Sequence, residues 1–202
     1  LQGAVFKGAK LAHASFAGAV LTGVDLKELN VPPEALKDCV TDVSPETIKA
    51  FDQMRARLDG HQEWIVSGGA QGNHCVFDGE DMRLLQKLVV GRPLTGLSAR
   101  GAIAIGLNFS GCQLQGARFD GTDLRDCDFT GADLRGASFR DAKISHARFD
   151  KADIRNLLLN SGNTRPTDFT GAQVTNDQFA AALREEGAIL GLAGQPAAAA
   201  TA

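Results

Sequence analysis

Residues 107–161 read, in groups of five, LNFSG CQLQG ARFDG TDLRD CDFTG ADLRG ASFRD AKISH ARFDK ADIRN LLLNS. The third position of each group is large and apolar, the first is mostly small, and the others are polar, charged or Gly. The third-position residues are Phe109, Leu114, Phe119, Leu124, Phe129, Leu134, Phe139, Ile144, Phe149, Ile154 and Leu159. The architecture of the chain follows from this uninterrupted run of eleven groups.

A period of five fits neither an amphipathic helix nor an alternating strand. It is typical of a solenoid, in which each unit buries its apolar side only against its neighbours. If each group forms one side of a four-sided coil, residues twenty apart lie above one another at about the 4.8 Å spacing of paired strands. This register predicts one column of Phe109, Phe129 and Phe149 and an opposite column of Phe119 and Phe139. We assign the third-position residues of the first ten groups to the structural core.

The outward positions carry balanced charge, with eight Asp and eight Lys or Arg in residues 107–161. The twenty-residue register predicts three opposite-charge stacks: Asp128 with Arg148, Asp123 with Lys143, and Asp120 with Arg140. It also places Arg135 over Arg155 and Asp133 over Asp153, which are like-charge stacks. Surface pairs contribute about 0–1 kcal/mol each, so we expect Arg125→Ala to be nearly silent.

Groups such as Ala132-Asp-Leu-Arg-Gly and Thr122-Asp-Leu-Arg-Asp resemble the A(D/N)LxG unit of the pentapeptide-repeat family. The resemblance implies an all-β solenoid, a right-handed quadrilateral β-helix of pentapeptide repeats. Some members of that family shield DNA gyrase, a type II topoisomerase, by imitating duplex DNA, and members often pair end to end. We expect the main β-helix to span residues 74–174.

Residues 1–31 show the same pattern in AVFKG, AKLAH, ASFAG and AVLTG, and form an N-terminal repeat stub. The chain begins at Leu1 already in repeat phase, so we expect it to be cut from a longer polypeptide. Residues 32–73 break the pattern and are expected to form a helical insert or cap. Pro45 suits the first turn of a helix, and Gly68-Gly69 suits its end.

The sequence HQEWIVSGGAQG, residues 61–72, resembles a segment that introduces repeat blocks in bacterial members of the family. We expect it to cover the first coil of the main block, with Trp64 packing inward as a cap residue. His61 and Trp64, one helical turn apart, and His74-Cys75 are the candidate ligand-binding residues. A cap needs such residues for packing, and no second pair at metal-ligand spacing accompanies them, so we interpret both as structural.

Residues 75–106 form a degraded repeat whose register slips by two residues near 84–88. The five-residue register is recovered after this slip, with Leu94, Ala99 and Ala104 at inward positions. The run 89–106 carries few charges, and two interpretations stay open: a locally bulged coil, or an exposed apolar docking face.

After a loop at 162–166, Phe169 and Val174 continue a last partial coil. Thr175 to Gln178 matches a capping box. We expect a C-terminal capping helix in 175–192, with Phe179 and Leu183 covering the open core, and a disordered tail in 193–202.

Composition sets broad limits on function. The net charge is −3 and mean hydropathy is −0.10, and no apolar run approaches the roughly 20 residues that span a bilayer. The cysteines, Cys39, Cys75, Cys112 and Cys127, have no CxxC spacing, which favours free thiols in a reducing, cytoplasmic compartment.

No catalytic, cofactor-binding or metal-binding set can be assembled from the sequence. We therefore expect a rigid protein-interaction scaffold without enzymatic activity, binding a protein partner that the sequence does not identify. A homodimer through the terminal helix is compatible with this interpretation. The balanced charge disfavours the alternative of a DNA mimic that binds a type II topoisomerase, and it also disfavours nucleic-acid binding.

Overall fold

The computed structural model describes residues 1–11, 14–36, 39–172 and 178–182. The chain forms two compact units, Leu1–Glu46 and Thr47–Ala202. The boundary falls inside the segment 32–73 that the sequence assigns to a single helical insert, so that insert is divided between the units.

The first unit is a short stack of repeats with its own small core. Phe16, Leu21, Val24 and Leu29 are buried together. Val20 forms a parallel bridge with Val40, twenty residues later. The backbone therefore stacks once more after the 3-10 helix η1 (Pro33–Leu36), which is why residues 32–46 belong with the repeats before them.

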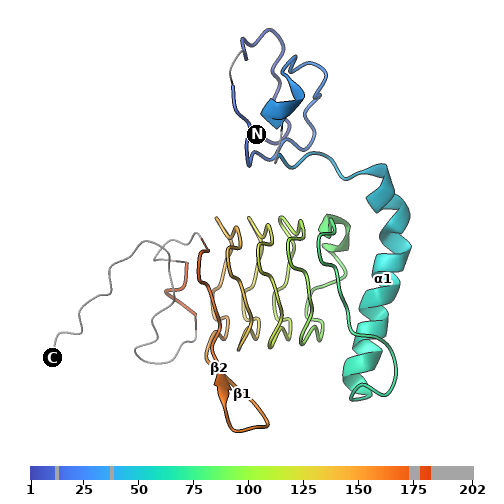
Figure 1. Ribbon diagram of the computed structural model, residues 1–202, viewed down its shortest axis with the longest axis vertical. Coiled ribbons are helices and arrows are strands. Elements are labelled where there is room, and N and C mark those ends of the chain that lie inside the picture. The colour runs from blue at the N-terminus through green and yellow to red at the C-terminus, as the bar shows by residue number, and fades with distance from the viewer. Residues whose placement is uncertain (12–13, 37–38, 173–177, 183–202) are drawn as a thin grey trace, which may run out of the picture. The chain divides into compact units, whose positions relative to one another are not determined.

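The second unit opens with helix α1 (Pro45–Val66), in the range where the sequence predicts a helix. Met54, Leu58 and His61 lie on its buried face, and the first two belong to the hydrophobic core of the coils. The spacing of these three residues places them on one side of a helix. Helix α1 lies against one end of the stacked coils (Figure 1).

The side chain of Arg57 fastens α1 to the first coil. Its guanidinium lies 4.5 Å from the centre of the Phe77 ring and forms two 2.6 Å hydrogen bonds with the carboxylate of Glu80. It also donates to the backbone oxygen of Val76 at 2.7 Å. A cation held over a ring and paired with a carboxylate fixes the helix in one orientation.

The coils repeat every twenty residues. Parallel bridges join the second position of each group to the same position one coil later, from Pro93 with Gln113 to Asp133 with Asp153. The first coil is longer, because Val76 pairs with Ser98 at an offset of 22 and the extra residues form the 3-10 helix η2 (Arg83–Leu85). The predicted two-residue slip is confirmed at this point. The right hand of the coil, implied by the family resemblance, stays a prediction.

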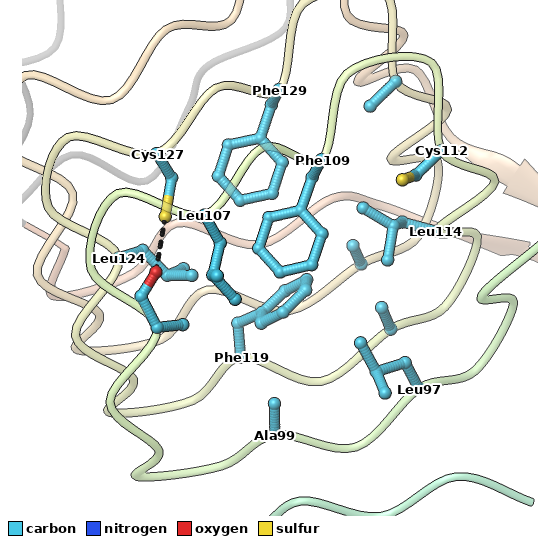
Figure 2. Packing of buried hydrophobic residues seen from close by; sticks show 14 of the residues in the cluster. Leu97, Ala99, Leu107, Phe109, Cys112, Leu114, Phe119, Leu124, Cys127 and Phe129 are labelled. Atoms are coloured by element: carbon cyan, nitrogen blue, oxygen red, sulfur yellow. Dashed lines mark hydrogen bonds between the residues drawn. The ribbon is translucent and has the colours of Figure 1, made fainter. Parts of the chain in front are cut away.

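Phenylalanine rings form two columns inside the coil, as the twenty-residue register predicts. The ring of Phe129 lies parallel to Phe109 at 5.2 Å and to Phe149 at 5.1 Å, with interplanar angles of 9°. Phe119 and Phe139 stack at 5.2 Å in the second column and meet the first column edge-on. Figure 2 shows Phe109 and Phe129 stacked, with Phe119 turned against them. Stacked and edge-on pairs add to the stabilisation that burial alone provides.

Some of the small first-position residues have a polar side-chain atom. That atom forms a hydrogen bond with the backbone of the preceding coil. The thiols of Cys112 and Cys127 donate to the backbone oxygens of Val89 and Ala104 at 2.9 and 3.0 Å, the latter drawn in Figure 2. Burial raises the pKa of the Cys112 thiol to about 11 and that of Cys75 to about 12. These thiols are therefore protonated packing residues near neutral pH.

The eleventh group of the run does not continue the coil. Its residues form β1 (Leu157–Leu158), which pairs antiparallel with β2 (Thr164–Arg165) in a hairpin that projects from the stack (Figure 1). Leu159, expected inside, is 39% exposed. The coil resumes after ten inserted residues, since Ser138 bridges Asp168 at an offset of 30. The inward direction that the five-residue pattern predicts for Leu159 is wrong, because the backbone there turns outward into the hairpin.

Candidate functional site

The interior of the described coils is filled by side chains, which leaves no space there for a ligand. Nine of the ten core residues predicted from the sequence are 0% exposed, and Ile154 is 5% exposed. The nine are Phe109, Leu114, Phe119, Leu124, Phe129, Leu134, Phe139, Ile144 and Phe149. Close packing of this kind leaves ligand binding to the outer surface and to the ends of the stack.

In the segment predicted to cap the first coil, the residue that points inward is not the one predicted from the sequence. The inward position that the sequence assigns to Trp64 is held by His61, which is 0% exposed, whereas Trp64 is half-buried. The Trp64 ring stacks on His61 at 5.6 Å and meets His74 edge-on at 5.5 Å. Trp64 thus shields His61 from the outside.

His61 is tied to the first coil through its own ring. Its Nδ1 accepts a hydrogen bond from the backbone N–H of Cys75 at 3.1 Å, which leaves the proton of the neutral ring on Nε2. Burial, reinforced by the nearby His74, lowers the pKa of His61. No group of three His, Cys, Asp or Glu side chains within the described ranges could hold a metal ion.

At the other end of the stack, Phe179 closes the core. It is 1% exposed, and its ring lies 4.7 Å from those of Phe149 and Phe169. Residues 178–182 form a turn, whereas the sequence predicts helix there. Leu183 and most of the expected capping helix lie outside the described residues.

A groove of about 340 Å³ lies between one coil face and the root of the hairpin. Its walls come from residues 118–120, 136–140 and 165–168. The hairpin lies close to the coil because the fifth-position glycine beneath it, Gly136, has no side chain: a Cβ there would be 2.8 Å from the Cβ of Leu157. Thr167 accepts from the backbone N–H of Gly136 at 3.1 Å and donates to the backbone oxygen of Leu134 at 2.9 Å.

The groove is lined by three arginines and two aspartates. Arg140 pairs with Asp168 at 2.5 Å, and Asp120 accepts a hydrogen bond from the hydroxyl of Ser138. Burial disfavours the charged form of Asp168, but hydrogen bonds from Thr170 and Arg140 outweigh it and lower the pKa of this carboxyl. Arg118 and Arg165 form no ion pair with any part of the chain that the structure describes.

Charges elsewhere on the surface are arranged differently from the predicted stacks. Asp128 lies 3.6 Å from Arg148, as predicted. Asp123 instead pairs with Arg125, two residues along the same coil, at 2.6 Å. Arg140 forms an ion pair with Asp168 rather than with Asp120. Asp133 with Arg135 and Asp153 with Arg155 form the same two-residue pair, so the like-charge stacks are neutralised within each coil.

The sequence contains a signal for the hairpin that the five-residue count overlooked. Phe alternates with an aliphatic residue at the third positions through Phe149 and Ile154, so the next third position should be Phe. Leu159 occupies it, and the next Phe is Phe169, ten residues later. The length of that delay equals the insertion. The repeat pattern does not identify Arg165 as a groove residue, because Arg165 lies inside the insertion.

Two family models match the chain. One, described as "Pentapeptide repeat region", matches residues 107–179, and another, described as "Pentapeptide repeats (8 copies)", matches residues 1–31. No curated protein matches the sequence. No helix among the described residues is both long enough and apolar enough to cross a bilayer.

Several solved structures are similar to parts of the chain. A pentapeptide repeat protein from the thylakoid lumen of Arabidopsis thaliana is 26% identical, with a TM-score of 0.27 over 46% of this chain and 60% of that one. The pentapeptide repeat protein Rfr23 from the cyanobacterium Cyanothece 51142 is 18% identical, with a TM-score of 0.31 over 55% and 89%. QnrB1, a plasmid-mediated fluoroquinolone resistance protein, is 18% identical, with a TM-score of 0.23 over 50% and 56%. The chain thus spans less than two thirds of the first and third of these structures.

Proposed function

The chain belongs to the pentapeptide-repeat family, and from this premise we propose that it is a rigid, non-enzymatic scaffold that binds a protein partner on its outer surface. The observation that carries the proposal is the fixed register of the coils. Parallel bridges recur at twenty residues from Pro93 through Asp153, so outward side chains stand in ladders of constant spacing. Preorganised side chains lose little freedom on binding, which favours recognition of a partner surface.

The filled interior supports the same proposal. Aromatic and aliphatic side chains occupy the axis of the coil, and the titratable groups of the described coils lie mainly in ion pairs on its outer side. Catalysis needs a pocket in which acids, bases or nucleophiles converge on a substrate. Outward-facing ladders of paired charges are suited to binding a partner surface rather than to catalysis.

A DNA mimic directed at a type II topoisomerase is the competing function. Such a protein must present an excess of negative charge to reach a DNA-binding groove. Residues 107–161 have equal numbers of acidic and basic side chains, and pairs such as Asp123 with Arg125 neutralise the carboxylates locally. This arrangement favours the scaffold.

Affinity capture with the intact protein, followed by mass spectrometry, tests the proposal. We expect reproducible capture of a defined protein that is released by added untagged chain. Failure to capture any protein above a control in which the chain has been heat-unfolded would contradict the scaffold function. A gyrase supercoiling assay separates the alternative, since inhibition at low micromolar chain concentration would favour the DNA mimic.

We also propose that two copies associate through the terminal segment 175–192. An end of a solenoid that is not covered exposes apolar side chains and unpaired backbone. Among the described residues, Phe179 covers the core at that end. Light scattering after size exclusion tests this, and a monomeric mass at micromolar concentration would contradict it.

A further inference from the structure

We propose that the groove between the coil face and the β1–β2 hairpin binds an acidic segment of a partner protein, whose carboxylates are contacted by Arg118 and Arg165. The inference rests on the proposed scaffold function and specifies the chemistry of the partner. It concerns one defined part of the surface rather than the ladders as a whole.

The first support is the pairing of charges on this coil face. Asp78 is bound by Arg100 at 2.7 Å, in the two coils that precede the groove, and Asp168 is bound by Arg140 in the wall of the groove. Ser138 donates to Asp120. Arg118 and Arg165 line the same groove and have no ion-pair partner among the described residues. Guanidinium groups left without a carboxylate beside otherwise satisfied acids are suited to carboxylates supplied by a partner.

The second support is the shape of the groove. Arg118 and Ser138 are bridged across one step of the stack, and Ser138 and Asp168 across the next, so the lining crosses three successive coils. At about 4.8 Å per step this corresponds to roughly 10 Å along the stack. An extended peptide rises about 3.3 Å per residue, so roughly three residues of an extended segment fit along that length.

The third support is the rigidity of the wall. Gly136 lets the hairpin approach the coil, and the hydroxyl of Thr167 bonds to the backbone of Gly136 and Leu134. Arg165 is itself paired with Leu157 across the two strands. Its guanidinium Nη1 lies 3.6 Å from the place where a Cβ on Gly116 would be, which puts the arginine against the coil. A wall held in this way needs little reordering when a ligand binds.

Peptide carboxylates fit this groove better than the backbone of a nucleic acid. The groove has a formal charge of +1, from three arginines against two aspartates. Nucleic-acid affinity comes from many phosphate contacts along a basic stripe. Asp120 and Asp168 would oppose a dense row of phosphates, whereas separate carboxylates can avoid them.

The test uses fluorescence anisotropy with a labelled octapeptide of alternating Glu and Gly, and the same peptide with Gln in place of Glu. We expect the Glu peptide to bind the intact chain at least tenfold more tightly than the Gln peptide, and binding to weaken as salt rises. Arg118→Gln combined with Arg165→Gln should weaken binding of the Glu peptide at least tenfold. Arg118→Gln alone should produce a smaller loss, and it covers the case in which the double variant does not fold.

The charge-matched control is Lys143→Gln combined with Lys151→Gln, which lowers the net charge equally at two positions outside the groove lining. Equal weakening by the control would show a general charge effect and overturn the proposal. So would equal binding of the Gln peptide, or no binding of the Glu peptide at 1 mM. Tighter binding of a duplex DNA oligonucleotide than of the Glu peptide, lost in the double arginine variant, would also overturn the peptide assignment.

The outcomes separate the groove from the scaffold. A partner captured equally by the parent and by the double arginine variant would sustain the scaffold and reject the groove as its docking site. Binding of the Glu peptide that depends on both arginines, with no protein captured in the affinity experiment, would sustain the groove chemistry and reject the broader function.

Discussion

The imidazole Nδ1 of His61 accepts a hydrogen bond from the backbone N–H of Cys75 at 3.1 Å, which joins helix α1 to the first coil. His61 is fully buried, and no partner within the described residues bonds to its Nε2. A protonated ring could not accept from Cys75, because both nitrogens would then carry hydrogen. This hydrogen bond between α1 and the first coil therefore depends on a neutral histidine.

Stability of the second unit should fall as the solution is acidified from pH 7.5 to pH 5. The pKa of His61 is lowered in the folded state, mainly by burial, so the unfolded chain binds the proton first. The stabilisation is complete above the ordinary histidine pKa of about 6.5, and it is lost progressively as pH falls toward the lower pKa of the folded state. Thermal melts across this range measure the loss as a falling melting temperature.

Two histidine variants separate this effect from general acidification. His61→Gln retains an oxygen that can accept from Cys75 and removes the titration, so its melting temperature should change little over the same range. His146→Gln, at an exposed coil corner, is the control in which the loss should persist. An equal loss in His61→Gln and the parent would rule out His61 as the source.

Removing one ring from the aromatic column should destabilise the coil severely. Phe129 is 0% exposed and stacks on both Phe109 and Phe149. Phe129→Ala should lower the free energy of unfolding by about 3–5 kcal/mol, and Phe129→Asp should prevent folding because it buries an unpaired charge. Circular dichroism with urea titration measures both. Leu158→Ala, at a residue 69% exposed in the hairpin, should stay within about 0.5 kcal/mol of the parent.

The pair of Arg125 with Asp123 revises the expectation that Arg125→Ala is nearly silent. Both nitrogens of the guanidinium fork reach the carboxylate, at 2.6 and 2.8 Å, and the two side chains are 18% and 9% exposed. Losing Arg125 leaves a mostly buried carboxylate without its partner, so we expect a cost of about 1–3 kcal/mol. Adding Asp123→Asn should recover much of the loss in urea titrations.

Arg148→Ala is the matched comparison for Arg125→Ala. Arg148 is 62% exposed and lies 3.6 Å from Asp128, so its removal should cost less than about 1 kcal/mol. Equal costs for the two variants would show that burial of the Asp123 pair has no energetic consequence.

The sequence predicts the stacking of the coil well because every third-position residue carries the same information. A register error of one residue would expose all of Phe109, Phe119 and Phe129 together, so the pattern tolerates only one arrangement. The fifth position of each group carries a separate backbone requirement, which its varied residue types do not reveal. Gly111 and Gly121 have φ of 66°, and Asp126 and Lys151 take φ of 60° and 56° at equivalent corners. Left-handed backbone is needed there whether or not Gly is present.

Features outside the repeat were harder to predict from the sequence. Leu157 and Leu159 satisfy an apolar pattern while leaving the coil, because an apolar residue is compatible with both a core and a hairpin. The groove depends on Arg165, whose position is set by that hairpin. Similarly, His61 and Trp64 are one helical turn apart, and only the rotation of α1 decides which of them is buried.

Gly72→Ala should destabilise the attachment of the loop that follows α1. A Cβ on Gly72 would lie 2.0 Å from the backbone oxygen of Gly60 and 2.7 Å from the backbone nitrogen of Trp64, so backbone must move. Gly111→Ala introduces the same left-handed strain, at about 1–2 kcal/mol, into open space. We expect a clearly lower melting temperature for Gly72→Ala than for Gly111→Ala. Equal temperatures would show that the loop does not fold back on α1.

Gly136→Ala should loosen the hairpin without disrupting the coil beneath it. A Cβ on Gly136 would lie 2.8 Å from the Cβ of Leu157 and 3.3 Å from the backbone oxygen of Arg165, whereas at Gly131 it would meet nothing within 4 Å. Both positions have left-handed φ, 67° and 66°, so Gly131→Ala shares the backbone strain and lacks the clash. Thermolysin should therefore cleave the hairpin faster in Gly136→Ala than in Gly131→Ala, while the two variants retain the same circular dichroism. Equal cleavage rates would mean that the hairpin does not rest on Gly136, and the groove would lose one of its walls.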